Sequence, residues 1–252
     1  MSELLDDLGR AVAVPGRVRR VVSLVPSLTE AVAVSAPGLL VGATDWCTHP
    51  AELDVARVRG TKNPDVPAAV ALAPDLVVAN EEENREADLA ELRAAGLAVW
   101  VTAPRTVAQS LDSLDRMLRA CGVDRPQWID DAESAWAAVT FATRRAALVP
   151  IWRRPWMVLG RDTFAGDVLA RLGVDNVYAD ADERYPKVEL AALTAAGAEL
   201  VVLPDEPYAF TADDGPEAFP GLPSALVSGR HLTWYGPSLA EAPTLLAAQL
   251  AV

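Results

Sequence analysis

The pattern LAPDLVVANEEEN, at Leu72–Asn84, returns as AGAELVVLPDEPY at Ala196–Tyr208 in this chain of 252 residues. Each stretch starts at the end of an apolar helix, continues through a short aliphatic run and ends in an acidic loop. Runs of this kind are typical of strands that are buried on both faces of a parallel sheet. The repeat therefore predicts two similar α/β lobes.

Strands and helices alternate on both sides of these two stretches, which predicts mainly parallel sheets covered by helices. In the first half we expect strands at Arg19–Val25, Leu39–Ala43, Pro74–Ala79 and Leu97–Thr102, with helices opening at the capping box Ser27–Glu30 and covering Glu86–Ala95. In the second half we expect strands at Trp156–Leu159 and Leu200–Leu203, with helices at Thr163–Leu172, Glu189–Ala196 and Ser238–Leu250.

The segment between the two halves shows helical periodicity instead. A capping-box pattern at Thr106–Gln109 precedes apolar residues along one helical face, and Gly122 interrupts them. A long helix is then expected over Trp128–Leu148. The predicted organisation is an N-terminal α/β lobe (residues 1–104), a connecting helical segment (105–148) and a C-terminal α/β lobe with a closing helix (149–252).

Ligands of open parallel sheets bind outside the carboxyl ends of the strands. When two such lobes face one another, these ends converge on a shared space, so the sequence predicts a small-ligand cleft between the lobes. The loops that follow the predicted strands are Pro26–Leu28, Asp45–Pro50, Asn80–Asn84, Gly160–Phe164, Asp205–Tyr208 and Thr233–Pro237.

Composition argues against several classes of function. A formal net charge of −13 repels the phosphate backbone of nucleic acids. No run reaches the roughly 18 apolar residues that would cross a bilayer. Because charges such as Asp6, Asp7 and Arg10 interrupt the first thirty residues, we expect a cytoplasmic protein, or a periplasmic or extracellular one if a signal was removed. With only Cys47 and Cys121, a disulfide framework is not expected.

Several segments, taken in order, carry a resemblance to a known family. They are RVVSLVPSLTE, LVGATDWCTHP, GTKNPDVPAAVALAPDLVVA, DTFAGDVLARLGVDNVYAD, RYPKVELAAL and LTWYGP. Together they resemble the vitamin B12-binding and siderophore-binding periplasmic-type proteins, the helical-backbone metal receptors, from about Arg17 to Leu250. The resemblance implies a non-catalytic receptor for a corrinoid, haem or ferric chelate, with no resident cofactor.

The resemblance also implies ligand-binding residues. Trp46 matches an aromatic residue that packs on the ligand, Tyr185 matches another in the second lobe, and Trp156 lies in a matching segment, as do Trp234 and its neighbour Tyr235. Large flat rings suit a macrocycle because they bury a large area at low entropic cost. Each tryptophan has the alternative role of closing the core.

Charged and metal-ligating residues leave several interpretations open. Cys47 and His49 form a Cys-x-His pair that suits a metal, although two ligands do not complete a site, and His49 alone suits the axial position of a metal held in a macrocycle. Glu81–Glu83 stand where a helix is expected to begin, so their carboxylates would interact with the helix dipole, or else repel an anionic ligand or attract a cationic partner. The pair Arg153 and Arg154 would meet a ligand carboxylate, or belong to a solvated loop.

Two departures from the family concern docking. Its B12-binding members carry a glutamate on each lobe that docks onto a membrane permease, and the matching positions here are Pro67 and Ala191. Neither side chain can form a salt bridge, so docking to an ABC permease is doubtful. A second aromatic residue of the first lobe is also replaced, near Thr61 or Asn80.

Two other classes of function compete with a binding protein. One is a chelatase-like tetrapyrrole or metal enzyme, in which His49 with Glu82 or Glu206 would act as base. The other is a ligand-free interaction scaffold. The sequence shows no nucleophile–base constellation, no phosphate-binding glycine loop and no dinucleotide fingerprint, so we expect no enzyme.

Overall fold

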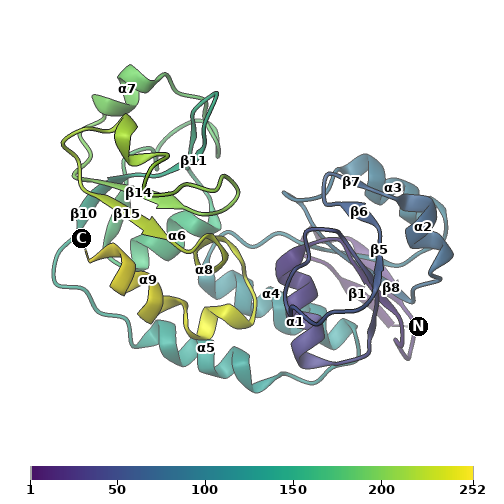
Figure 1. Ribbon diagram of the computed structural model, residues 1–252. Coiled ribbons are helices and arrows are strands. Elements are labelled where there is room, and N and C mark those ends of the chain that lie inside the picture. Colours follow the sequence, from purple (N-terminus) through teal and green to yellow (C-terminus); the bar gives the residue numbers. More distant parts are fainter. Residues whose placement is uncertain (1, 252) are drawn as a thin grey trace. The chain divides into compact units, whose positions relative to one another are not determined.

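A computed structural model describes residues 2–251 as two compact units, each with its own parallel sheet (Figure 1). The first unit comprises residues 2–104, 108–130 and 235–237, and the second comprises residues 105–107, 131–234 and 238–251. The two expected α/β lobes are confirmed. The segment expected to connect them is itself divided, because most of its first helix belongs to the first unit and residues 131–148 belong to the second.

The first unit is built on a five-stranded parallel sheet with the order β5-β4-β3-β8-β9. The strands are β3 (Val21–Ser23), β4 (Leu40–Ala43), β5 (Ala56–Arg57), β8 (Leu76–Asn80) and β9 (Val99–Thr102). The helices are α1 (Pro26–Ser35), α2 (Val66–Ala71), α3 (Glu86–Ala94) and most of α4 (Val107–Ala120), and a short hairpin is formed by β6 (Arg59–Gly60) and β7 (Asn63–Pro64).

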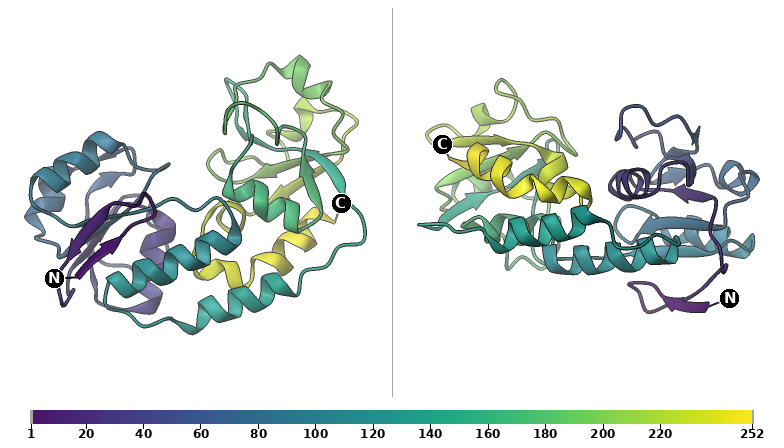
Figure 2. Two further views of the ribbon diagram at one scale, coloured as in Figure 1. Left: turned by 180° about the vertical axis from the view of Figure 1, so that it is seen from behind. Right: turned by 90° about the horizontal axis from the view of Figure 1, so that it is seen from below.

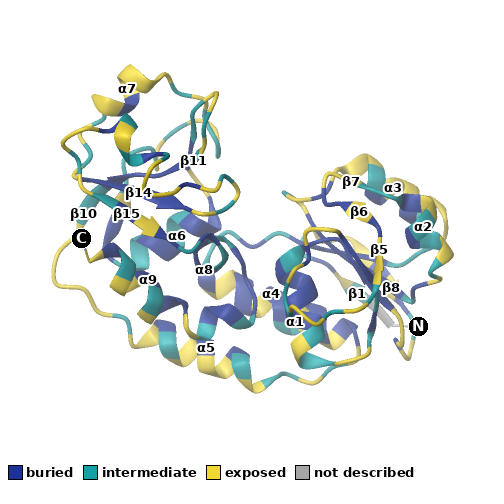
Figure 3. Ribbon diagram, in the orientation of Figure 1, coloured by how far each residue is buried: buried dark blue, intermediate teal, exposed yellow. Residues whose placement is uncertain are grey.

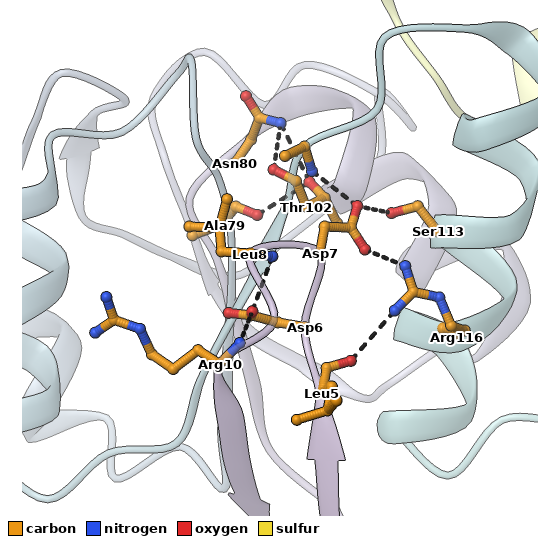
Figure 4. A network of polar contacts seen from close by, with 11 residues as sticks. Leu5, Asp6, Asp7, Leu8, Arg10, Ala79, Asn80, Thr102, Ser113 and Arg116 are labelled. Atoms are coloured by element: carbon orange, nitrogen blue, oxygen red, sulfur yellow. Dashed lines mark hydrogen bonds and ion pairs between the residues drawn. The ribbon is translucent and has the colours of Figure 1, made fainter.

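An N-terminal hairpin of β1 (Ser2–Leu5) and β2 (Ala11–Val14) forms a separate two-stranded ribbon (Figure 2). In its turn, Asp6 Oδ1 accepts hydrogen bonds from the amides of Leu8 and Arg10. Asp7 Oδ2 accepts from Ser113 Oγ at 2.6 Å and from the Ala103 amide at 2.8 Å, and Asp7 also pairs with Arg116 (Figure 4). The charges that interrupt the N-terminal sequence therefore attach the hairpin to β9 and α4.

The second unit contains a four-stranded parallel sheet with the order β13-β10-β14-β15. Its strands are β10 (Arg145–Leu148), β13 (Val174–Asn176), β14 (Leu200–Pro204) and β15 (Ser224–Val227), and β11 (Pro150–Trp152) pairs with β12 (Met157–Val158) as a separate hairpin. The helices are α6 (Phe164–Arg171), α7 (Leu190–Thr194), α8 (Gly229–Thr233) and α9 (Ala242–Leu250), with 3-10 turns η1 (Pro216–Ala218) and η2 (Pro237–Ala240).

Two predictions about helices are wrong. The helix expected over Trp128–Leu148 is α5 (Gln127–Ala137), and Arg145–Leu148 is instead the strand β10. Alanine favours a helix in isolation, but this segment is paired on both sides, with β13 and β14, and sheet pairing outweighs local propensity. The Ser27–Glu30 capping box does not form, because α1 starts one residue earlier, at Pro26.

Each unit has its own hydrophobic core around the strand that the repeat predicted. Every residue of β8 and of β14 is buried (Figure 3). Val77, Ala79 and Leu92 belong to the core of the first unit, and Val201, Leu203 and Phe219 belong to that of the second. The loops that follow β8 and β14 are thus anchored to rigid strands.

Candidate functional site

The loop after β4 presents the most exposed aromatic side chain among the described residues, Trp46, at 67% exposure. Its indole lies against the β6–β7 hairpin, where a Cβ at Gly60 would come within 3.3 Å of Trp46 Nε1 and 2.5 Å of Asn63 Oδ1. The amide of Asp45 donates to the Arg59 carbonyl at 2.8 Å. Because only glycine leaves this space, the hairpin forms a close support for the exposed ring.

Buried contacts hold the base of the same loop. The Cys47 thiol is fully buried and lies 3.0 Å from Thr29 Oγ1 and 3.1 Å from Thr44 Oγ1. Burial raises its pKa above the ordinary range, so the thiol stays protonated. Arg57 donates to the carbonyls of Thr44 and Cys47, each at 2.9 Å. The Trp46 loop is therefore rigid.

The predicted Cys-x-His metal pair does not form a site. Metals bind the thiolate, and the Cys47 thiol is buried and protonated. His49 is half-buried, with Nδ1 3.2 Å from Thr48 Oγ1. Within residues 2–251, the structure shows no group of three or more His, Cys, Asp or Glu residues that would hold a metal ion. The axial role of His49 towards a metal that arrives in a ligand stays a prediction.

The acidic loop after β8 is a hydrogen-bonded turn rather than the start of a helix. Asn80 Oδ1 accepts from the amides of Glu82 and Glu83 at 2.8 and 3.1 Å. Asn84 Oδ1 accepts from the Asn80 amide at 2.9 Å, and its Nδ2 donates to the Leu24 and Thr61 carbonyls. Helix α3 starts only at Glu86, so the interpretation of Glu81–Glu83 as helix-dipole partners is wrong. Asn84 instead ties three segments together.

Trp234 and Tyr235 are neighbours in sequence but belong to different units, and each is 8% exposed. Tyr235 belongs to the first unit, where it hydrogen-bonds the Thr102 side chain and burial raises its pKa strongly. Trp234 Nε1 donates to Glu206 Oε2 at 2.9 Å, and the Arg230 guanidinium lies 6.0 Å from its ring. The structure therefore exposes little of either ring, and their contact with a ligand stays a prediction.

In the second unit, Trp156 and Tyr185 are both half-buried and lie on segments that run side by side. The amide of Val188 donates to the Trp156 carbonyl at 3.2 Å, and the amide of Val158 donates to the Pro186 carbonyl at 3.1 Å. The loop before Tyr185 presses on Gly160, where a Cβ would come within 2.1 Å of the Glu183 carbonyl oxygen. Sequence reasoning named both aromatics but not this glycine contact.

Trp156 packs on the hydrophobic core of the second unit and covers it. Its ring stacks on Phe210 with centroids 6.2 Å apart and meets the edge of Phe219 at 5.3 Å. A second aromatic pair, Trp152 and Tyr208, was missed by sequence reasoning, with centroids 5.7 Å apart and an interplanar angle of 78°. The position of Tyr208 at the end of the repeated strand-loop pattern was the available signal.

One interpretation of the sequence expected Arg153 to pair with a ligand carboxylate, but the structure pairs it within the chain. Its guanidinium pairs with Asp214 and, at 2.5 Å, with Glu217 Oε1, and only 15% of its side chain is exposed. It also lies 5.2 Å over the Trp156 ring. The charge of Arg153 is therefore neutralised by two carboxylates of the second unit. An anionic ligand at this point would meet both of them.

The structure does contain a serine–histidine–carboxylate chain that the sequence did not reveal. Ser228 Oγ lies 2.7 Å from His231 Nδ1, and His231 Nε2 lies 2.9 Å from Glu241 Oε1. A serine hydrolase needs free amides beside its nucleophile to stabilise an oxyanion. Here the amide of Gly229, the next residue, donates to the Asp205 carboxylate at 2.6 Å. Because this amide is already hydrogen-bonded, it is not free to stabilise an oxyanion, and the arrangement favours a structural role at the start of α8.

The positions matched to permease-docking acids lie on the surface. Pro67 is in the first turn of α2 and Ala191 is in the first turn of α7, and both are exposed. Glu189, directly before α7, is exposed as well, whereas Asp65 before α2 accepts from the Ala68 amide and pairs with Arg59 at 3.5 Å. Among the described residues, no helix is long and apolar enough to cross a membrane.

Comparison with known proteins shows similar sequences, although no family model matches the chain. The vitamin B12-binding protein of Salmonella typhimurium is 29% identical over 200 residues, which cover 73% of this chain and 71% of the relative. The vitamin B12-binding protein of Vibrio cholerae serotype O1 is 23% identical over 189 residues, which cover 71% and 67%.

Solved structures share the fold over almost the whole chain. The periplasmic heme-binding protein RhuT from Roseiflexus sp. RS-1 superimposes with a TM-score of 0.76 at 22% identity, covering 92% of this chain and 98% of its own. The periplasmic vitamin B12 binding protein BtuF of Vibrio cholerae gives 0.74 at 18%, covering 94% and 98%. Helicobacter pylori CeuE with Ni(II) bound gives 0.83 at 14%, covering 100% and 89%. The resemblance seen in the sequence is confirmed.

Proposed function

We propose that this chain, which resembles vitamin B12-binding and haem-binding proteins, is itself a non-catalytic binding protein. Its ligand is a metal-containing macrocycle or chelate: a corrinoid, haem or a ferric siderophore. The protein needs no resident cofactor, because the metal arrives within the ligand. The relatives and structural neighbours described above carry the names of binding proteins, which supports this class of function.

The observation that carries the proposal is the exposed ring of Trp46. It follows the carboxyl end of a parallel strand, where ligands of such sheets bind, and it is 67% exposed. The Gly60 hairpin and the buried base of its loop hold the ring in place, so that stacking costs little conformational entropy. His49, three residues further on, lies in the same loop and supplies the axial ligand to the bound metal.

Within the second unit, the proposed ligand contacts are Trp156 and Tyr185, whose segments run side by side after β11 and β13. Trp234 and Tyr235, each 8% exposed, are the further ligand contacts that we propose in their respective units. The chelatase alternative is not favoured, because no described group of His, Cys, Asp and Glu residues would hold the metal to be inserted.

Binding is tested by titrating the purified protein with cyanocobalamin, haemin and a ferric siderophore while following the fluorescence of its seven tryptophans. At least one ligand is expected to quench the signal with saturation at micromolar concentrations. Trp46→Ala should raise the Kd for that ligand about tenfold, the effect of losing one stacked aromatic ring.

Trp128→Phe is the matched control, because Trp128 is a half-buried tryptophan of the first unit whose Nε1 donates to Ser35 Oγ at 2.9 Å. This substitution also removes one fluorophore but should leave the Kd unchanged. Absence of saturable quenching by all three ligands would refute the proposed function.

Location and docking form part of the proposal. The cytoplasmic location expected from the sequence gains no support from the comparisons, since RhuT and BtuF are described as periplasmic. We favour the alternative of a periplasmic or extracellular protein, which fractionation of cells expressing the native gene would test. Docking to an ABC permease through paired acids is not expected at α2 and α7, because Pro67 and Ala191 carry no charge.

A further inference from the structure

Gly160, directly after β12, lies against the segment that carries Tyr185, and both belong to the second unit. The glycine is buried, and its position leaves no room for a side chain. A Cβ would come within 2.1 Å of the Glu183 carbonyl oxygen and within 3.0 Å of both the Arg184 carbonyl oxygen and Pro186 Cδ. These three residues flank Tyr185 on both sides. Only glycine lets the chain around Tyr185 approach this closely.

Backbone pairing holds the two segments in one antiparallel register. The Gly160 amide donates at 2.7 Å to the carbonyl of Arg184, the residue directly before Tyr185. The bridge between Met157 and Lys187 continues the same register on the other side of Tyr185. Because a slip of one residue turns a side chain to the opposite face, this register decides where the Tyr185 ring lies.

Gly160 is itself fixed from a different direction. Asn176 Nδ2, at the end of β13, donates to the Leu159 carbonyl at 2.8 Å and to the Gly160 carbonyl at 3.4 Å. Thr163, the residue that caps α6, also donates to the Gly160 carbonyl, at 3.5 Å. The sheet and a helix of the second unit therefore hold the glycine in place, and it cannot retreat from an added side chain.

The segment opposite Gly160 is the part that can yield. Residues 182–186 lie in neither a helix nor a strand, Glu183 is exposed, and the next three residues are half-buried. Segments with few buried contacts are the first to move. A normal contact with an added Cβ would require the Glu183 carbonyl oxygen, now 2.1 Å from that point, to move by roughly 1 Å. Tyr185, two residues further on, would be displaced with it.

We propose that Gly160 is a positioning residue that places the Tyr185 ring for contact with the ligand. This inference rests on the proposed function, which assigns Tyr185 to the ligand contacts of the second unit. Gly160 is buried and has no side chain, so it acts only through the position of Tyr185. A ring that is placed in advance binds at low entropic cost, and a displaced ring loses contact area as well.

The test is calorimetric titration of the wild-type protein and its variants with cyanocobalamin, haemin and ferrichrome. For each probe that the wild-type protein binds, Gly160→Ala and Tyr185→Ala should each raise the Kd about tenfold. The double variant should lose no more than Tyr185→Ala alone, because both substitutions remove the same contact. Additive losses, or binding by Gly160→Ala within twofold of the wild-type protein, would overturn the inference.

Gly173→Ala is the matched control for substitution at a crowded glycine. Gly173 also belongs to the second unit, and a Cβ there would come within 2.8 Å of Phe141 Cγ, at a φ of +79°. This substitution should lower the melting temperature and leave every Kd unchanged. A rise in Kd equal to that of Gly160→Ala would overturn the inference, because a general loss of stability would then explain both results.

Asn176→Ala is the second variant, and it decides the question if Gly160→Ala does not fold. It frees the Leu159 and Gly160 carbonyls without adding a side chain. The Kd should rise several-fold in the wild-type background and stay unchanged in the Tyr185→Ala background. Equal changes in the two backgrounds would overturn the inference and leave the proposed function intact. Failure of the wild-type protein to bind any of the three probes would overturn both.

Discussion

The loops after β8 and after β14 begin from the same sequence pattern and end in different chemistry. In the first unit, the pattern ends in Asn84, which is 5% exposed and hydrogen-bonds the backbone of three segments. In the second unit, the matching residue is Tyr208, which is half-buried and places its ring against Trp152. Equivalent positions thus serve two different purposes.

The two units share an α/β scaffold but use the same loop position for different interactions. The first unit uses its loop end to close a polar network, and Trp46, from another loop, is the one aromatic residue among its described residues that is largely exposed. The second unit gathers rings at the loop end and supports them with ion pairs to Arg153. Each loop follows a parallel strand and lies at the carboxyl edge of its own sheet. The side chains of the loop therefore determine whether it forms a polar network or an aromatic surface.

The largest effect is expected from Asn84→Ala. The substitution removes three hydrogen bonds and leaves the buried Asn80 amide and the Leu24 and Thr61 carbonyls without this partner. The free energy of unfolding should fall by about 3 kcal/mol, because buried polar groups without partners are costly. Urea denaturation followed by circular dichroism measures it.

Tyr208→Ala provides the comparison within the second unit and should cost clearly less stability, since its ring is partly exposed. Equal losses for Asn84→Ala and Tyr208→Ala would contradict the division of roles between the two loops. Asn84→Asp keeps the acceptor for the Asn80 amide but turns a carboxylate oxygen towards the Leu24 and Thr61 carbonyl oxygens, so it should recover none of the stability lost in Asn84→Ala.

An intermediate loss of stability, equal in the two units, is expected when a helix cap is removed from either unit. Asp65 caps α2 by accepting from the Ala68 amide at 3.0 Å, and Thr163 caps α6 by accepting from the Gly166 amide at 3.2 Å. Replacing either residue with alanine should cost about 1 kcal/mol of stability. Thermal unfolding of the two variants measures both losses. Unequal losses would show that the units differ in their helices as well as in their loops.

The smallest effect is expected from acid acting on Asp214 and Glu217 of the second unit. Asp214 and Glu217 have lowered pKa values in the folded protein, so their contribution is present above the ordinary carboxyl pKa near 4 and is lost as the pH falls through the lowered values. As the pH falls below about 4 and through these lowered pKa values, the Trp152–Tyr208 pair should loosen, which near-ultraviolet circular dichroism would detect. Asp214→Asn should abolish most of this change.

The Asn80–Asn84 network serves as the internal reference for the acid experiment. Its hydrogen bonds join amides, a hydroxyl group and backbone atoms. The one shifted carboxyl group of this loop, Glu83, has a pKa raised by burial, so it is already protonated where Asp214 and Glu217 lose their charge. Amide hydrogen exchange at Asn80 should therefore stay protected at the pH at which the second unit changes. Loss of protection at the same pH would show that the two loops are not independent.

Sequence reasoning succeeded where the local pattern and the tertiary environment agree. The aliphatic runs at Leu76–Asn80 and Leu200–Pro204 are buried central strands, as the repeat indicated. It failed at Arg145–Leu148, where alanines suggested a helix and pairing with two strands imposed β10. Trp46 could be named from the resemblance, but its exposure and its support by Gly60 could not be read from the sequence.

The sequence by itself determined two α/β units with a buried strand in each, because burial on both faces of a sheet demands uninterrupted aliphatic runs. Only the tertiary structure decided which polar and aromatic residues are available. It buried Cys47 beneath its loop, matched Arg153 with two carboxylates, and left Trp46 and Trp152 exposed. Availability depends on contacts between segments far apart in the chain, and no local pattern encodes those contacts.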